Sequence, residues 1–199
     1  MSRVPGVARA ETTRSRLYDA AVRAFADKGF HGTTTREIAA ASGMSAAALY
    51  VHHRSKEELL FVISRQGHES TLQLIRAAIS STADPAEGLR RAIHDFAMHH
   101  ANEPTVARIV NYELDALVPE HLREIRGIRR DIEGEVRRVV VRGVRAGCFV
   151  VADAELSAAA LLSLGVDLAR WYRSGGRWTP EQIAEQYAEL ALRMVGATH

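Results

Sequence analysis

Apolar residues recur three and four positions apart along almost the whole chain, as Leu17, Ala21 and Ala24 illustrate. This is the period of one face of an α-helix, whereas the alternation of apolar and polar residues that is typical of half-buried strands is nearly absent. The only strand-like run, 148–151, is too short and too isolated to found a sheet. The pattern predicts an all-α protein.

Capping residues and glycines divide this pattern into separate helices. A hydroxyl followed three residues later by Glu or Gln satisfies free backbone N–H groups at a helix start, and proline fits the first turn because its missing N–H is not needed there. Glycine takes the left-handed conformation that ends a helix. Starts are indicated at Thr34, Ser55, Asp84, Asp153 and Thr179, and stops at Gly29, Gly43, Gly147 and Gly175-Gly176. The nine predicted helices are 11–28, 35–42, 46–52, 56–80, 85–101, 104–117, 119–146, 154–174 and 180–196.

The composition excludes several classes of protein. With 199 residues, 47% of them hydrophobic and 25% charged, the chain can bury one sizeable core and a small appendage. No apolar stretch approaches the roughly 18 residues that a membrane span needs, and residues 1–10 show no secretory signal. The single Cys148 cannot form an internal disulfide or a thiolate metal site. We therefore expect a cytoplasmic protein with no membrane partner.

Residues 29–50 carry the most specific local pattern. Gly43 separates two short predicted helices, which apolar residues such as Ile38 and Leu49 would hold at a steep angle. In a helix-turn-helix protein, the N-terminal residues of the second helix meet base edges in the major groove of DNA. The short side chains of Ala46 and Ala47 would let this helix approach a surface closely. The segment therefore predicts a DNA-binding helix-turn-helix.

Nine residues in and beside this segment are candidate DNA contacts. Hydroxyls and N–H groups at the start of the first short helix suit a phosphate, as does an ammonium group just beyond the second helix. The first 60 residues hold nine basic and six acidic residues, although the formal net charge of the whole chain is only +2. The candidates are Thr34, Thr35, Arg36, Ser45, Ala46, Ala47, Tyr50, His52 and Lys56.

Many positions of this segment match the pattern of one known family. They are Gly29, Thr33 to Thr35, Ile38-Ala39, Gly43, Ser45, Leu49-Tyr50, His52 and Ser55-Lys56-Glu57-Glu58-Leu59. The segment resembles the DNA-binding domain of TetR-family transcriptional repressors. Ala47, where glycine is common, and His53, where the family usually has a core phenylalanine, depart from the pattern. The resemblance implies a flexible arm at 1–10, a helix-turn-helix domain at 11–57 and a larger ligand-binding and dimerisation domain at 58–199.

The last two predicted helices fit self-association. The helix at 154–174 is apolar almost all round, so both of its sides must be covered, and the helix at 180–196 carries Ile183, Tyr187 and Leu190 at helical spacing. The resemblance implies a homodimer in which two such helices from each chain form a four-helix interface. The alternative is a fully buried helix in a monomer.

The resemblance also implies a small-molecule effector in the larger domain. Residues 169–187 are similar to the C-terminal end of TetR subgroups that regulate fatty-acid and sterol degradation, and such proteins commonly sense acyl-CoA thioesters. A pocket between helices needs a few polar groups in an apolar lining. Asp95 and His99 share a helix face, but a metal site there is not expected. The candidate ligand-binding residues are Phe96, His99, Arg108, Tyr112, Leu162, Val166 and Trp171.

The expected function is that of a ligand-responsive repressor, which binds a pseudo-palindromic DNA operator as a dimer. A small hydrophobic effector, with an acyl-CoA thioester as the first candidate, would release the repressor from its operator. One alternative is a TetR-type regulator of drug efflux with an aromatic or lipophilic ligand, and another is an architectural DNA-binding protein without ligand. No enzyme activity, catalytic residue or cofactor is expected, because the chain contains no nucleophile-and-base motif and no glycine-rich phosphate loop.

Overall fold

The structure is a computed structural model that describes the backbone of residues 5–197 and the side chains of residues 13–197. Within this range the protein is all-helical, and the nine predicted α-helices are confirmed. They are α1 (Pro5–Gly32), α2 (Thr35–Ala41), α3 (Ala46–His52), α4 (Lys56–Ser80), α5 (Pro85–Asn102), α6 (Pro104–Tyr112), α7 (Pro119–Arg145), α8 (Ala154–Trp171) and α9 (Pro180–Met194), with a short 3-10 helix, η1 (Leu114–Ala116), between α6 and α7.

Two predicted segments differ from the structure. Residues 5–10, which fall within the predicted arm at 1–10, form the first turns of α1; proline is well suited to this first helical position, and residues 1–4 lie outside the described part. The predicted helix 104–117 breaks at Glu113. The break lets Leu117 pack into the core that lies beneath α1.

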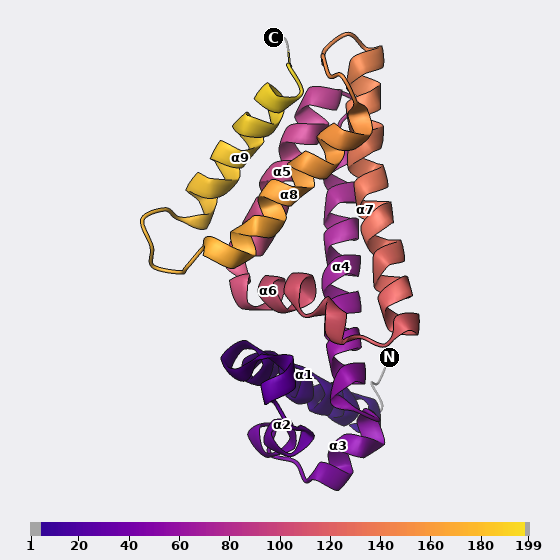
Figure 1. Cartoon of the computed structure of the whole chain (residues 1–199), viewed down its shortest axis with the longest axis vertical. Helices are drawn as coiled ribbons and strands as arrows, with labels where there is room; N and C mark the ends of the chain where they lie inside the picture. The colour runs from indigo at the N-terminus through magenta and orange to yellow at the C-terminus, as the bar shows by residue number, and fades with distance from the viewer. Residues whose placement is uncertain (1–4, 198–199) are drawn as a thin grey trace.

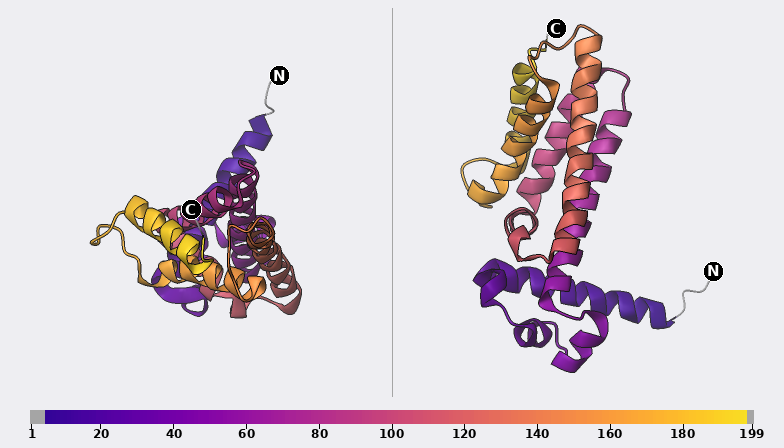
Figure 2. Two further views of the ribbon diagram at one scale, coloured as in Figure 1. Left: turned by 90° about the horizontal axis from the view of Figure 1, so that it is seen from above. Right: turned by 45° about the vertical axis from the view of Figure 1, so that its right-hand side comes forward.

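Helices α1 to α3 form an N-terminal module at one end of the molecule (Figure 1). Helix α1 lies crosswise to the long helices α4 and α7 (Figure 2). Gly29, with φ 70°, interrupts the helical backbone inside α1, and Gly43, with φ 73°, lies in the turn after α2; both have a positive φ that glycine adopts readily. The Thr33 hydroxyl then closes the end of α1 by donating to the carbonyl oxygens of Gly29 and Ala24, at 2.8 and 2.9 Å.

The remaining helices form a larger body in which α5 packs against α4, α7, α8 and α9. Its core is made of aliphatic side chains from all of these helices, with Phe96 and Phe149 among them. Figure 1 shows α4 and α7 side by side along the body, with α9 on the opposite flank and α8 running obliquely across the front toward α7. None of the described helices is long and apolar enough to cross a membrane.

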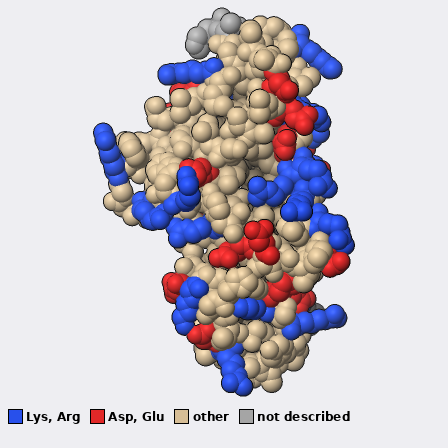
Figure 3. All heavy atoms as spheres, in the orientation of Figure 1, with Lys and Arg blue, Asp and Glu red and all other residues tan. Residues whose placement is uncertain are grey.

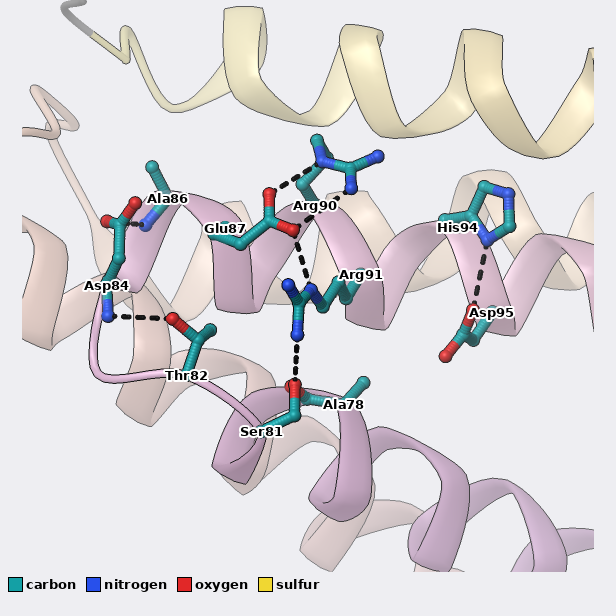
Figure 4. Close-up of polar contacts among 10 residues, drawn as sticks. All are labelled: Ala78, Ser81, Thr82, Asp84, Ala86, Glu87, Arg90, Arg91, His94 and Asp95. Carbon is teal, nitrogen blue, oxygen red and sulfur yellow. Dashed lines mark hydrogen bonds and ion pairs between the residues drawn. The ribbon is translucent and has the colours of Figure 1, made fainter.

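The turn between α4 and α5 is held by charged side chains (Figure 4). The Glu87 carboxylate accepts from Nε of Arg90 at 2.8 Å and from Nε of Arg91 at 2.6 Å, and Arg91 also donates to the Ser81 hydroxyl at 2.9 Å. Arg90 and Arg91 lower the pKa of Glu87 to about 2. These contacts fix the end of the body that lies far from the N-terminal module.

The N-terminal module and the body share a continuous core. Ile109 and Val110 of α6, together with Ile125 of α7, are buried in the same cluster as the apolar residues of α1 to α3. Helix α4 begins in the module and runs on into the body (Figure 1). Helices α4 and α6 therefore connect the body directly to the module.

Candidate DNA-binding surface and ligand cavity

The turn between α2 and α3 has the geometry of a helix-turn-helix. Buried Ile38 and Leu49 hold the two helices together, and Ser45 caps α3 by accepting a hydrogen bond from the N–H of Ala48 at 3.2 Å. Ala47 is exposed, and the side chain of Tyr50 is 53% exposed. One face of α3 is thus held by the core while the other presents small and aromatic side chains to solvent.

Hydroxyl groups at the start of α2 are tied to α3 and to the helix itself. The Thr35 hydroxyl lies 3.2 Å from the phenol oxygen of Tyr50. Thr34 forms the predicted capping box with Glu37. Lys28 also binds the Glu37 carboxylate, and the contacts with Lys28 and Thr34 lower the pKa of this exposed carboxyl to about 2.

The structure gives Lys56 a contact that the sequence did not indicate. Its ammonium group donates to the carbonyl oxygens of Phe30 and Thr33, both at 2.8 Å, and lies 4.4 Å from the centroid of the Phe30 ring. Lys56 therefore caps the C-terminal end of α1, where a cation is favoured. Contact between this group and a DNA phosphate stays a prediction.

Two further side chains of this region differ from their expected roles. Ser55 caps α4 through the N–H of Glu58, but the Glu58 carboxylate accepts from the N–H of Arg54, so the predicted reciprocal capping box is not formed. His53, at the departure from the family pattern, is half-buried with no hydrogen-bond partner for Nδ1. Burial lowers its pKa, so the ring packs as a neutral group.

The other DNA-binding candidates occupy accessible positions. Arg36 is exposed, while Ala46 and His52 are half-buried. The sequence analysis missed Val51, which is 82% exposed beside Tyr50. An apolar side chain at such a place can contact a thymine methyl group. The helical period of the sequence indicates this exposure, because Val51 lies on the opposite side of α3 from the buried Leu49.

A cavity of about 310 Å³ lies between α4, α5, α6, α7 and α8. Five of the seven candidate ligand residues line it, and the lining adds polar side chains that were not predicted. The five are Phe96, His99, Tyr112, Leu162 and Val166.

The structure places the other two candidates, Arg108 and Trp171, elsewhere. Nε of Arg108 lies 3.4 Å from the carbonyl oxygen of Ala169, and Trp171 packs against Tyr172 and Trp178. Neither residue lines the cavity, so the cavity gives no support to their assignment as ligand-binding residues, which stays a prediction.

Polar residues beyond the seven candidates also line the cavity, and four of them lie together. His68 lies on α4, His100 on α5, Asn111 on α6 and Arg129 on α7. Asn111 donates to the carbonyl oxygen of Ala107 at 2.8 Å and accepts from Nη1 of Arg129 at 3.2 Å. Residues from different helices thus converge on one polar cluster in the cavity.

Burial changes the protonation of this cluster. Desolvation lowers the pKa of His68 and that of His100 to about 4 in each case. Both rings hydrogen-bond through Nδ1 to the carbonyl oxygen four residues earlier, from Ser64 at 2.7 Å and from Phe96 at 3.0 Å. Desolvation also lowers the pKa of Arg129. At neutral pH this cluster therefore holds two neutral imidazoles and one guanidinium.

The structure offers no metal centre at the histidines of α5. His94 and Asp95 pair with each other at 3.0 Å (Figure 4), while His99 faces the cavity. No group of three or more His, Cys, Asp or Glu side chains suited to a metal occurs among the described residues.

The outer faces of α8 and α9 carry exposed apolar side chains. Ala158, Leu161 and Leu168 turn one face of α8 into the body core. Leu156 on α8 is 70% exposed, and Leu190 on α9 is 42% exposed. Elsewhere, Lys and Arg are interspersed with Asp and Glu over the face that Figure 3 displays.

Comparisons with known proteins agree with this architecture. Residues 17–63 match the family described as bacterial regulatory proteins, tetR family, and residues 82–195 match the tetracyclin repressor-like C-terminal domain. A solved regulatory protein of the tetR family from Rhodococcus RHA1 is 41% identical, with a TM-score of 0.89 over 94% of this chain and 98% of its own.

Two further relatives have more specific names. The HTH-type transcriptional repressor KstR2 of Mycobacterium tuberculosis is 27% identical over 96% of both chains. AibR, solved in complex with isovaleryl coenzyme A and operator DNA, is 25% identical with a TM-score of 0.82, over 89% of this chain and 97% of its own. The helix-turn-helix, the helical body and both family matches establish that this chain belongs to the TetR family of bacterial regulatory proteins.

Proposed function

We propose that the protein is a cytoplasmic, ligand-responsive transcriptional repressor that binds a pseudo-palindromic DNA operator as a homodimer and is released by a small hydrophobic effector. The observation that carries this proposal is the position of α6. Its Ile109 is buried in the core of the N-terminal module, while its Asn111 and Tyr112 line the cavity. A ligand that moves α6 would therefore move the DNA-binding module.

The outward faces of α8 and α9 support the homodimer. A helix that is apolar on both sides needs cover on both sides, and Leu156, Leu190 and Met194 are exposed in the single chain. Leu190→Glu should convert the dimer to a monomer in sedimentation experiments, because it buries a charge in the interface. Val144→Glu, on the exposed surface of α7, is the matched control and should leave the dimer intact.

An acyl-CoA thioester is our first candidate for the effector. The solved relative AibR binds isovaleryl coenzyme A, and Leu162, Val166 and Ile132 give this cavity an apolar wall. A cavity of about 310 Å³ is at the small end of ligand sites. It suits an acyl group, with the nucleotide part of the thioester outside.

A DNA-binding measurement tests the proposal. The purified chain should bind DNA from upstream of its own gene at least about a thousandfold more tightly than random duplex at the same salt concentration. Addition of acyl-CoA thioesters of increasing chain length should weaken that binding. Equal affinity for both DNAs would overturn the repressor function, and release by lipophilic drugs but by no thioester would favour a regulator of drug efflux.

A further inference from the structure

His68 lines the cavity and carries a buried hydrogen-bond acceptor without a partner among the described residues. Its Nδ1 lies 2.7 Å from the carbonyl oxygen of Ser64. A carbonyl only accepts, so Nδ1 carries the hydrogen and Nε2 of the neutral ring is an acceptor. The side chain is only 5% exposed, and Nε2 has no hydrogen-bond partner in the described part of the chain. A buried polar atom in this condition costs stability until a donor reaches it.

Arg129 presents unused donors to the same cavity. Its guanidinium group has five N–H donors, of which Nη1 binds Oδ1 of Asn111 at 3.2 Å. Among the residues that the structure describes, no carboxylate forms an ion pair with Arg129. The positive charge of Arg129 contributes to the lowered pKa of His68, so the two groups lie near each other. The cavity therefore offers a donor and an acceptor in one region.

The neighbouring polar groups are already satisfied. The Asn111 amide donates to the carbonyl oxygen of Ala107 at 2.8 Å and lies 3.4 Å from Nε2 of His100, whose own Nδ1 donates to Phe96. Within the cluster of His68, His100, Asn111 and Arg129, a ligand therefore meets two open positions, one at His68 and one at Arg129.

The charge of the lining disfavours an anionic ligand group. Three carboxylates line the cavity together with the one guanidinium: Glu103 between α5 and α6, Glu133 of α7 and Asp167 of α8. A carboxylate ligand would accept from Arg129 but has no hydrogen to donate to Nε2 of His68. A neutral group that both donates and accepts fits the two open positions.

We propose that the cavity takes an apolar ligand bearing a neutral hydroxyl or carboxamide group, which donates a hydrogen bond to Nε2 of His68 and accepts one from Arg129. This inference rests on the proposed effector function of the cavity. It adds a polar recognition element that an unsubstituted acyl chain lacks. A site that hydrogen-bonds a ligand hydroxyl discriminates against the analogue without it.

Two pairs of small probes test the inference on the full chain by calorimetric titration. Octanol and heptyl methyl ether are isomers, and only the alcohol can donate a hydrogen bond. Octanamide and octanoate have similar shape, and only the amide is neutral with donor hydrogens. We expect octanol to bind about tenfold more tightly than the ether, and octanamide about tenfold more tightly than octanoate. If octanol binds more tightly than the ether but octanamide shows no preference over octanoate, the ligand carries a hydroxyl group. If only octanamide shows its expected preference, the ligand carries a carboxamide group.

His68→Phe keeps an aromatic ring but removes the acceptor, so it should abolish the preference for octanol over the ether. His94→Phe changes a histidine of α5 that does not line the cavity and should keep the preference. Equal binding of octanol and ether to the native chain would overturn the inference without need of a variant, as would a preference that survives in His68→Phe.

Operator binding by the same preparation separates this inference from the proposed function. If the chain binds its operator but none of the four probes, the ligand inference is wrong and the repressor function stands. If the probes bind with the expected preferences but the chain binds operator DNA no better than random DNA, the ligand inference stands and the repressor function is wrong.

Discussion

The phenol oxygen of Tyr50 lies 3.2 Å from the hydroxyl oxygen of Thr35, so the exposed face of α3 is linked to the first residue of α2. This link orients the Tyr50 ring, which is more than half exposed. We expect Tyr50→Ala to weaken operator binding by about 1–3 kcal/mol and random-DNA binding much less. Fluorescence anisotropy at fixed salt would measure both affinities.

Thr35→Val serves as the partner of Tyr50→Phe in a double-mutant cycle. If the hydroxyl pair acts as a unit, the two losses of operator affinity should be less than additive in the double variant. Full additivity would show that Tyr50 and Thr35 contact DNA independently.

Lys56 is expected to act on stability more than on DNA affinity. Its ammonium group is occupied by the carbonyl oxygens of Phe30 and Thr33. Lys56→Met keeps the apolar stem and should lower the stability of the chain by about 1 kcal/mol, because charge-assisted hydrogen bonds are lost at a partly exposed site. Thermal unfolding followed by circular dichroism would show this as a lower melting temperature.

Arg36→Met is the matched control for Lys56, since Arg36 is an exposed candidate phosphate contact. It should leave the melting temperature unchanged and reduce the slope of log affinity against log salt by about one. If Lys56→Met produced the slope change and no loss of stability, Lys56 would be a phosphate contact, as the sequence alone suggested.

The helix-turn-helix could be predicted from sequence because its signals are local. Thr34 and Ser45 cap helices within three residues of themselves, and Gly43 takes the left-handed conformation that the turn demands. Such signals act through neighbouring backbone groups and need no knowledge of the rest of the fold. The extra turns of α1 were missed because residues 5–10 carry no strong signal for or against a helix.

The polar cluster in the cavity could not be predicted, because it depends on how distant helices cross. Arg129 is one of many arginines on α7, and the packing of α4 against this helix and the contact with Asn111 of α6 leave it half-buried. Arg108 and Trp171 were selected by residue type, and neither of them lines the cavity. Phe96 and Leu162 line it because they follow the apolar face of their helices.

Glu57 joins the start of α4 to the start of α7. Its Oε1 accepts from Nδ1 of His121 at 2.8 Å and from the N–H of Val118 at 3.0 Å, and the His121 ring stacks on Phe61. Glu57→Gln should weaken this connection between the cavity helices and the module. We expect operator binding without effector to persist, while an effector that releases the native chain becomes severalfold less effective.

Glu69→Gln is the control for Glu57, because Glu69 is exposed on the same helix. It should leave the release of DNA unchanged. Equal release by the native chain and Glu57→Gln would show that the contact with α7 does not carry the coupling.

The buried histidines predict a loss of stability in mild acid. The pKa of His68 and that of His100 are lowered from 6.5 to about 4, so between these values the unfolded chain binds protons that the folded chain does not. Stability therefore falls as the pH drops from about 6.5 toward about 4, by up to about 1.4 kcal/mol per pH unit for each group. The melting temperature should be lower at about pH 5 than at about pH 7.5.

His100→Gln should make that pH dependence shallower, because one of the two groups no longer titrates. The exposed carboxyl of Glu37 has a pKa of about 2, so its own contribution to stability is lost only at lower pH. An unchanged dependence in His100→Gln would contradict the buried, neutral state of this ring.

Gly165 of α8 lies against Phe96, one of the residues that line the cavity. A Cβ atom at this position would lie 2.3 Å from Cε1 and 2.5 Å from Cδ1 of Phe96, so Gly165→Ala must displace the ring and should cost about 1–3 kcal/mol. Gly127→Ala is the control, because its Cβ would meet only Arg130 at 3.9 Å and alanine favours a helix by about 0.5–1 kcal/mol over glycine. Thermal unfolding should therefore shift the two melting temperatures in opposite directions, whereas a stabilised Gly165→Ala would show that Phe96 can move freely.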